Sequence, residues 1–191
     1  MPAPDRPRIY LAGPEVFLPN AKDIGAAKAA VCAAAGCIGA FPLDTSLDLG
    51  GLAPLEQARL ISRSNEELMR SCDALIANLT PFRGVSMDSG TAFEVGFMRA
   101  LERPVFGYTN IAGDYRSRAE TFRRAAAEWN DSDHSAIAIE DFGLAENLMI
   151  DIALRETGVA PVCVEVARGE ELTDLRGFEV CLAAALATLR R

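Results

Sequence analysis

The sequence predicts an α/β protein in which helices cover both faces of a central, parallel, five-stranded sheet. Three observations support this fold class. Short apolar segments alternate with longer segments of helical pattern from residue 8 to residue 108. The apolar segments show little alternation between apolar and polar residues, as expected of strands that are buried on both faces. A strand–helix alternation of this kind favours parallel strands joined by helical crossovers.

The first half of the predicted sheet comes from two apolar segments. RIYLA, at residues 8–12, is a short buried strand that a Gly-Pro pair ends. Residues 21–35 are rich in alanine and are predicted to be helical. CIGAFPLD, at residues 37–44, is a second strand, closed by Pro42. Residues 54–71 repeat apolar side chains at helical spacing and form the second helix.

The second half of the pattern is clear as far as residue 108. DALIANL, at residues 73–79, is a strand, and the loop at 80–90 follows it. A helix at 90–101 then leads to a strand at 103–108. Each of these segments continues the alternation of the first half and extends the same parallel sheet.

The pattern is weaker beyond residue 110. Residues 116–129 have a helical pattern, PVCVEVA at 161–167 is a fifth strand, and 172–189 form a closing helix. No internal repeat or long linker interrupts the chain. Residues 1–191 are therefore expected to form a single domain.

The charge balance limits the classes of partner. The 191 residues carry a formal net charge of -8, and the pI is about 4.8. A nucleic-acid polymer or an anionic membrane surface would require a basic face, so neither is expected as a partner. No stretch reaches the roughly 18 apolar residues that a membrane-spanning helix needs. A small substrate that carries a nucleobase remains compatible with this charge.

The cysteines and the histidine limit the chemistry. The five cysteines are scattered, show no metal-ligand spacing and lie mostly in apolar segments, so they are expected to be reduced thiols of a cytoplasmic protein. The first residues lack the long apolar segment of a signal peptide. The single histidine, His134, lies in a polar segment and is expected in a solvated loop. One histidine excludes multi-histidine metal sites and disfavours a Ser-His-Asp triad, so carboxylates are the leading candidates for catalysis.

Ligands of such a sheet bind beyond the carboxyl ends of its strands. This rule places four segments on one rim: Gly13 to Glu15, Leu43 and Asp44, residues 80–90, and the residues from Tyr108 onward. The segment AGPEVF after the first strand matches neither GxGxxG nor a P-loop. NAD and ATP are therefore not expected as ligands.

Glu94 is an acidic residue in an apolar stretch, MDSGTAFEVG at residues 87–96. A carboxylate between Phe93 and Val95 loses hydration, which costs free energy unless a partner compensates. The helix N-terminus supplies a positive dipole and free N–H groups, and the Tyr10 hydroxyl at the end of the first strand can donate a hydrogen bond. The alternative, on pattern alone, is an ordinary solvated position on an amphipathic helix.

Asp88 begins the same helix, and an N-cap is its simplest role. Asp88 and Glu94 nevertheless belong to one loop–helix unit on the ligand rim. Two carboxylates in different environments can divide nucleophilic and acid–base work, as in enzymes that cleave glycosides. Gly90 has no side chain and would let a ligand approach this helix closely.

Four segments of the chain resemble the nucleoside 2-deoxyribosyltransferase family. They are IYLAGPEVF at 9–17, CDALIANLTPFRG at 72–84, DSGTAFEVGF at 88–97 and FGLAENLM at 142–149. Each is a weak signal alone, but together they occur in the family's order. The resemblance implies a Rossmann-like or flavodoxin-like fold and base exchange on 2'-deoxyribonucleosides, with free nucleobases as co-substrates and no metal or organic cofactor.

The resemblance also implies roles for individual residues. Glu94 matches the family's nucleophile, which forms a covalent deoxyribosyl intermediate so that configuration is retained. Tyr10 matches the tyrosine that orients this glutamate, and Asp88 matches an aspartate that holds the sugar hydroxyls and helps to move a proton. Asn147 and Met149 match residues that a neighbouring subunit supplies, which implies a homo-oligomer that is at least a dimer.

The remaining candidates are expected to bind substrate. Phe17 and Phe82 would stack on a planar base, with core packing as the alternative. Arg83 is a contact to base or phosphate, or else a structural partner of a carboxylate. Asn65 stands where some family members have an aspartate that protonates the base. Because an amide cannot do so, Asp88, a water or the Asp44 loop is left as the proton source. Gly13 lies on the same rim.

Two other functions remain open at this stage. Water can intercept the glutamyl intermediate, which would make the protein a hydrolase of deoxynucleosides or of deoxynucleoside 5'-monophosphates. Glu15 argues against a monophosphate, because a nearby carboxylate repels phosphate. The second alternative is a module that senses a nucleotide without turnover. The choice between purines alone and purines with pyrimidines stays open.

Overall fold

The five strands form one all-parallel sheet in the order β2-β1-β3-β4-β5. The computed structural model describes residues 6–127 and 137–190. The strands are β1 Arg8–Ala12, β2 Ile38–Ala40, β3 Ala74–Asn78, β4 Val105–Thr109 and β5 Val162–Cys163. This strand order is that of flavodoxin-like proteins, and it reverses between β1 and β3. The predicted fold class, a helix-covered parallel sheet of five strands, is confirmed.

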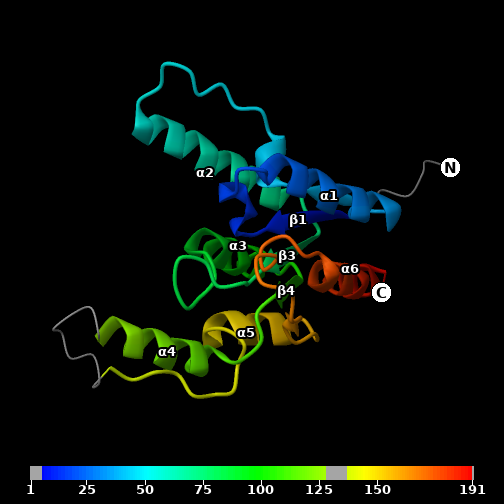
Figure 1. Cartoon of the computed structure of the whole chain (residues 1–191). Coiled ribbons are helices and arrows are strands. Elements are labelled where there is room, and N and C mark those ends of the chain that lie inside the picture. Colours follow the sequence, from blue (N-terminus) through cyan, green and yellow to red (C-terminus); the bar gives the residue numbers. More distant parts are fainter. Residues whose placement is uncertain (1–5, 128–136, 191) are drawn as a thin grey trace.

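Helices connect the strands and cover the sheet. They are α1 Ala21–Ala34, α2 Pro54–Arg70, α3 Ser89–Ala100, α4 Tyr115–Ala127, α5 Leu148–Arg155 and α6 Arg176–Leu189. Two short 3-10 helices, η1 Pro14–Phe17 and η2 Pro42–Asp44, follow β1 and β2. Helices α2 and α4 extend away from the body of the molecule at two separate corners (Figure 1).

Side chains of successive strand residues enter two different cores. Ile9 and Leu11 of β1 belong to the core beneath α1 and α6, whereas Tyr10 and Ala12 belong to the core beneath α2, α3 and α5. Each strand residue therefore faces the helices on one side of the sheet, because strand side chains alternate between faces. This alternation points Tyr10 toward α3, which carries Glu94.

The structure shifts several predicted boundaries. The strand expected at 37–44 ends at Ala40, because Pro42 opens η2 and the backbone N–H of Phe41 donates to Asp44 Oδ2 at 2.9 Å. The strand expected at 161–167 keeps only Val162–Cys163. The closing helix begins at Arg176 and not at residue 172. Helix α5 was not predicted, since the motif FGLAENLM breaks the helical pattern just before it.

Other predictions concern single residues. Four of the cysteines are buried, Cys163 is exposed, and all five are free thiols. His134 and the end of the helix expected at 116–129 lie outside the described residues. None of the helices in the described ranges is long and apolar enough to span a membrane.

Candidate active site

A cleft of about 280 Å³ opens at the carboxyl ends of β1 and β3, where the strand order reverses. Four segments form its walls: the turn after β1, the turn after β2, the middle of α2 and the first turns of α3. This is the place where open parallel sheets bind their ligands. The segments that the sequence analysis assigned to one rim after β1, β2 and β3 therefore meet here.

Glu94 lines the cleft and is held from beneath by Tyr10. The fully buried Tyr10 hydroxyl donates a hydrogen bond to Glu94 Oε1 at 2.6 Å. The pKa of Glu94 is raised to about 7. Burial is the largest cause, the charges of Asp88 and Glu15 contribute to the rise, and the Tyr10 hydrogen bond opposes it. Burial, together with the neighbouring Glu94 charge, also raises the pKa of Tyr10, so the phenol stays a donor. Glu94 is thus not an ordinary solvated helix position.

Asp88 lines the same cleft and is the N-cap of α3. Its Oδ2 accepts hydrogen bonds from the Thr91 backbone N–H at 3.0 Å and from the Thr91 hydroxyl at 3.3 Å. Asp88 can therefore cap the helix and face the cleft with the same side chain, so the structural and the functional role do not exclude each other. The arrangement places two carboxyl groups in one cleft, one at the helix terminus and one a turn and a half further along.

Two stacked aromatic rings stand at one side of the cleft, one in its wall and one behind that ring. Phe17, about half exposed, lines the cleft, and its ring stacks on Phe82 with centroids 5.5 Å apart. The Arg83 guanidinium lies 4.7 Å from the Phe17 centroid and 4.6 Å from the Phe82 centroid. Phe17 is therefore not a core residue, and Arg83 contacts two rings instead of a carboxylate.

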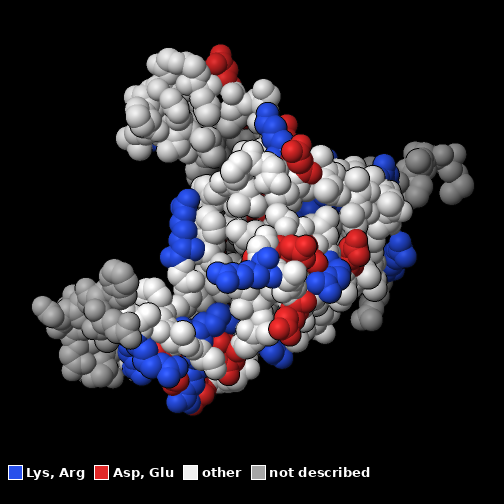
Figure 2. All heavy atoms as spheres, viewed as in Figure 1, with Lys and Arg blue, Asp and Glu red and all other residues white. Residues whose placement is uncertain are grey.

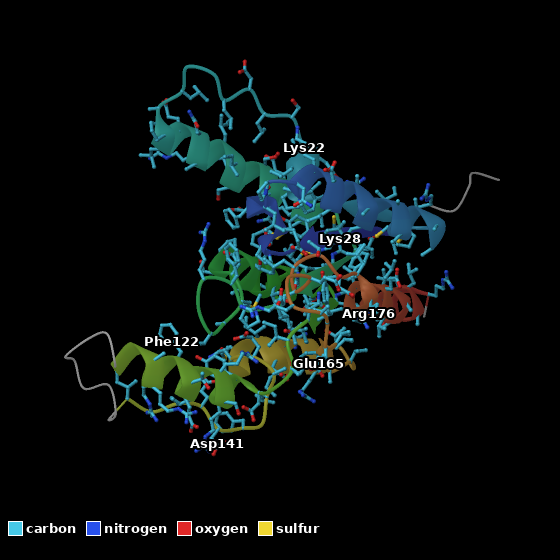
Figure 3. The ribbon with its side chains drawn as sticks, in the orientation of Figure 1. Lys22, Lys28, Phe122, Asp141, Glu165 and Arg176 are labelled. Atoms are coloured by element: carbon cyan, nitrogen blue, oxygen red, sulfur yellow. The ribbon has the colours of Figure 1, made fainter. Side chains whose placement is uncertain are left out.

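The turn after β1 rests on a buried polar cluster. Glu15 is completely buried, forms an ion pair with Lys28 of α1 and accepts hydrogen bonds from Asn78 at 2.9 Å and Tyr108 at 3.2 Å. Lys28 points from α1 toward the middle of the molecule (Figure 3). A Cβ at Gly13 would meet Glu15 Oε2 at 1.9 Å, so only glycine leaves room for this carboxylate beside the cleft.

This cluster corrects one step of the sequence analysis. Glu15 was expected to repel phosphate from the ligand rim, but it is buried and its charge is compensated by Lys28. Glu15 and Lys28 are 13 residues apart and lie on different elements, so the sequence gives no sign that they pair. The conclusion about phosphate must therefore rest on the residues that line the cleft.

The other candidates divide between the wall and its surroundings. Asn65 lines the cleft from α2, one turn after Ile61, and Gly90 lines it from α3. Asp44 follows Leu43 on the rim, but its carboxylate accepts the Phe41 N–H and is not part of the wall. The sequence analysis missed some of the wall: Val16, Pro42, Ile61 and Thr91. The i, i+4 spacing from Asn65 could have identified Ile61.

Asn147 and Met149 do not line the cleft of their own chain. Asn147 is the N-cap of α5, where its Oδ1 accepts the Met149 N–H at 3.0 Å and its Nδ2 donates to Glu140 at 2.7 Å. Met149 exposes 72% of its surface. Within the described residues, no group of three or more His, Cys, Asp or Glu side chains is placed to hold a metal ion.

Comparison with known proteins identifies the relatives of this chain. The chain is 31% identical over 168 residues to an uncharacterised protein of Schizosaccharomyces pombe, C191.05c, covering 80% of this chain and 79% of the other. A solved 2-desoxiribosyltransferase from Leishmania mexicana is 29% identical, with a TM-score of 0.55, and the match covers 75% of this chain and 85% of that one. A conserved protein of Enterococcus faecalis V583 shares the fold at 18% identity and a TM-score of 0.55, over 94% of this chain and 98% of that one.

The family comparison agrees with these similarities and with the cleft. The model of the nucleoside 2-deoxyribosyltransferase family matches residues 9–149, from β1 to the start of α5. The matched region includes Tyr10, Asp88 and Glu94. Because the match spans well over half of the 191 residues, the chain belongs to the nucleoside 2-deoxyribosyltransferase family.

Proposed function

We propose that this protein exchanges the base of 2'-deoxyribonucleosides, with Glu94 as the nucleophile. Membership of the family and the similarity to the Leishmania enzyme support deoxyribosyltransferase activity. The observation that carries the assignment to Glu94 is its position in the cleft wall, with its Oε1 held by the Tyr10 hydroxyl. The hydrogen bond orients one carboxylate oxygen and leaves the other for the substrate.

The reaction proceeds in two displacements. A Glu94 oxygen forms a bond to the anomeric carbon while the bond from that carbon to the base nitrogen breaks, and the base leaves with a proton. A nitrogen of the second base then attacks the same carbon, the Glu94 carboxylate departs, and the proton of that nitrogen returns to the group that protonated the first base. Two inversions give retention. The carboxylate stabilises the oxocarbenium-like charge of each transition state.

The proton on the leaving base needs a donor in the cleft. Asp88 is the carboxyl group besides Glu94 in the cleft wall, whereas Asp44 lies outside it and already accepts a hydrogen bond. Asn65 lines the wall but has no proton to give. We therefore assign the proton transfer to Asp88, directly or through a water that it holds.

The remaining wall is suited to the base. The exposed Phe17 ring, stacked on Phe82, offers a flat apolar surface, and the Arg83 guanidinium packs on both rings. Stacking on such a ring accepts a purine or a pyrimidine. Gly90 is exposed and leaves the backbone accessible on the wall, where the sugar would approach Glu94. Gly13 also lines the wall, but it is buried beside the Glu15 carboxylate.

We further propose that the active form is a homo-oligomer in which Asn147 and Met149 complete a neighbour's cleft. Exposed apolar side chains support a self-association surface. They come from α2, α3 and α5: Leu55, Leu60, Ile61, Phe93, Met149 and Ile152. On the face shown in Figure 2, the surface over α2 carries few charged side chains.

The test is base exchange followed by chromatography. The protein is mixed with deoxyinosine and adenine, or with thymidine and adenine, in the absence of phosphate. Deoxyadenosine from the first mixture alone indicates purine specificity, and deoxyadenosine from both indicates broad scope. Glu94→Ala abolishes exchange, whereas Glu156→Gln, which alters an exposed pair with Arg99, leaves it unchanged. Substantial exchange by Glu94→Ala would contradict the assignment.

The same experiment separates the rival functions. Free hypoxanthine or thymine without deoxyadenosine would identify a hydrolase. Hydrolysis of deoxynucleoside 5'-monophosphates is disfavoured, because the described residues of the cleft wall include two carboxylates and no lysine or arginine. No turnover of any of these substrates would leave a sensing module.

A further inference from the structure

The Glu146 carboxylate joins two segments that the proposed reaction requires. It is 1% exposed, and its Oε1 accepts hydrogen bonds from the Ser86 hydroxyl at 2.5 Å and from the Asn147 backbone N–H at 2.9 Å. Its Oε2 accepts the Met87 backbone N–H at 3.2 Å. Ser86 and Met87 immediately precede Asp88, so one carboxylate fixes both the approach to Asp88 and the position of Asn147.

Arg118 of α4 holds the same junction from the other side. Its Nε donates to the Val85 carbonyl at 3.0 Å, and one of its terminal nitrogens donates to the Ala145 carbonyl at 2.6 Å. That nitrogen also lies 3.6 Å from Glu146 Oε2, which compensates the buried charge. The two segments, 85–87 and 145–147, are therefore clamped together by a paired anion and cation.

We propose that Glu146 is a positioning residue shared by two active sites, acting on Asp88 of its own chain and on the Asn147 that its chain presents to a neighbour. The inference rests on the proposed function, in which Asn147 completes a neighbouring cleft. Glu146 lines no part of its own cleft, so it acts only through these two segments. A displacement of about 1 Å in either segment is enough to slow the reaction strongly.

Two neighbouring side chains, Ser86 and Glu140, each allow one of the two segments to be perturbed separately. The Ser86 hydroxyl reaches Glu146 from the Asp88 side. Glu140 contacts the Asn147 side, where its Oε1 accepts Asn147 Nδ2 at 2.7 Å and its Oε2 accepts the Leu148 N–H at 2.9 Å. Ser86→Ala leaves Glu146 its bonds from the Met87 and Asn147 N–H groups, so it is expected to perturb mainly the approach to Asp88. Glu140→Gln is expected to perturb the Asn147 segment alone. These variants are the matched controls for Glu146→Gln, which perturbs both.

The experiment uses hetero-oligomers purified through two different affinity tags. One chain carries Asn147→Ser, which keeps an N-cap residue but removes the amide, and the other carries Glu94→Ala. Each variant is inactive alone. A mixed pair has one complete site, built from Glu94 and Asp88 of the first chain and Asn147 of the second. Restored base exchange in the mixture establishes the shared site on which the inference depends.

Each further variant is then placed on one chain at a time. Glu146→Gln is expected to lower kcat of the complete site roughly tenfold on either chain. Ser86→Ala is expected to lower it mainly on the chain that supplies Glu94, and Glu140→Gln only on the chain that supplies Asn147. Glu156→Gln, which alters the exposed ion pair with Arg99, is expected to leave kcat unchanged on either chain. Melting temperatures of all the variants are compared, so that a loss of folding is recognised. If Glu146→Gln does not fold, Ser86→Ala and Glu140→Gln carry the test.

The possible failures are distinct. If the two parent variants restore no activity in the mixture while the unmodified protein exchanges bases, the trans role of Asn147 is wrong and the inference falls with it. If exchange is restored but Glu146→Gln acts on one chain only, Glu146 serves a single site and the inference is overturned. Equal effects of Ser86→Ala on both chains would indicate a general structural defect and would overturn it as well.

Discussion

At the scale of single residues, Glu94 couples catalysis to pH through the Tyr10 hydrogen bond. The pKa of Glu94 is raised to about 7 by burial and by Asp88 and Glu15, and Tyr10 works against that rise. A nucleophile must be ionised, so kcat/KM, which reports the free enzyme, should increase as the pH rises through about 7.

Tyr10→Phe should move the rise of the rate around pH 7 to higher pH. The reason is that it removes the hydroxyl whose hydrogen bond favours ionised Glu94. The rate should also fall roughly ten- to a hundredfold, as expected for a lost hydrogen bond to a charged group. Asp88→Asn should lower the rate, because Asp88 is assigned the proton transfer. It should also move the rise of the remaining rate to lower pH, since it removes a neighbouring negative charge and keeps the N-cap. Steady-state rates between pH 5 and 9 measure both shifts, and shifts in the same direction would refute this account.

The same pKa predicts how Glu94 affects folding stability. The unfolded chain has the ordinary glutamate pKa of 4.5, whereas the folded protein binds this proton more tightly. The cost of ionisation therefore grows as the pH rises from 4.5 to about 7, stays constant above that pH, and is absent below 4.5. Glu94→Gln should be more stable than the unmodified protein at pH 8, by at most about 3 kcal/mol, with no gain at pH 4. Urea unfolding at both pH values checks this, and Glu156→Gln is the exposed control.

At the scale of elements, the loop between β3 and α3 carries strain that the aromatic wall offsets. Arg83 has φ of 56°, a left-handed conformation that favours glycine, while its guanidinium packs on Phe17 and Phe82. Arg83→Ala loses the packing and keeps the strain, whereas Arg83→Gly loses both.

Arg83→Gly should therefore be more stable than Arg83→Ala by about 1 kcal/mol in thermal unfolding. Both variants should raise KM for the nucleobase several-fold while changing kcat less, because Phe17 loses its support but Glu94 is untouched. An unchanged KM in both would show that Phe17 holds its position without Arg83. Equal stabilities would show that the backbone at residue 83 relaxes.

The elements were more predictable from the sequence than their packing. Each strand of the first 110 residues has an apolar centre, and Gly, Pro or Asp lies at or near at least one of its ends, so hydrophobicity and these residues located it. Tyr10, Asp88 and Glu94 followed from their places at strand ends and at a helix start, together with the family resemblance. Lys28, Arg118 and Glu146 did not, because their partners are far away in the sequence and buried polar pairs leave no periodic signal. Helix α5 was missed because the motif before it has no helical period.

At the scale of the whole molecule, the two faces of the sheet depend on different parts of the chain. The family match ends at residue 149, yet one core is completed by α6, which contributes buried side chains: Phe178, Cys181, Leu182, Ala185 and Leu186. Phe178 is fully buried and meets Tyr108 edge-on, with centroids 6.4 Å apart. The Tyr108 hydroxyl in turn donates to Glu15 beneath the cleft. The last helix is therefore connected to the cleft through two side chains, although it contributes nothing to the cleft wall.

Phe178→Ala should cost about 3–5 kcal/mol of unfolding free energy, as expected when a buried ring is removed. Val180→Ser, on the exposed side of the same helix, should change it by less than about 0.5 kcal/mol. Base exchange at a temperature where Phe178→Ala remains folded should still fall, because Tyr108 and Glu15 lose their fixed position beside Gly13. A chain ending at residue 160 should show no cooperative unfolding, since it would lose β5 and α6 and leave α1 as the only described helix over this core. A soluble, cooperatively folding chain of that length would show instead that α1 alone covers this face and that α6 is dispensable.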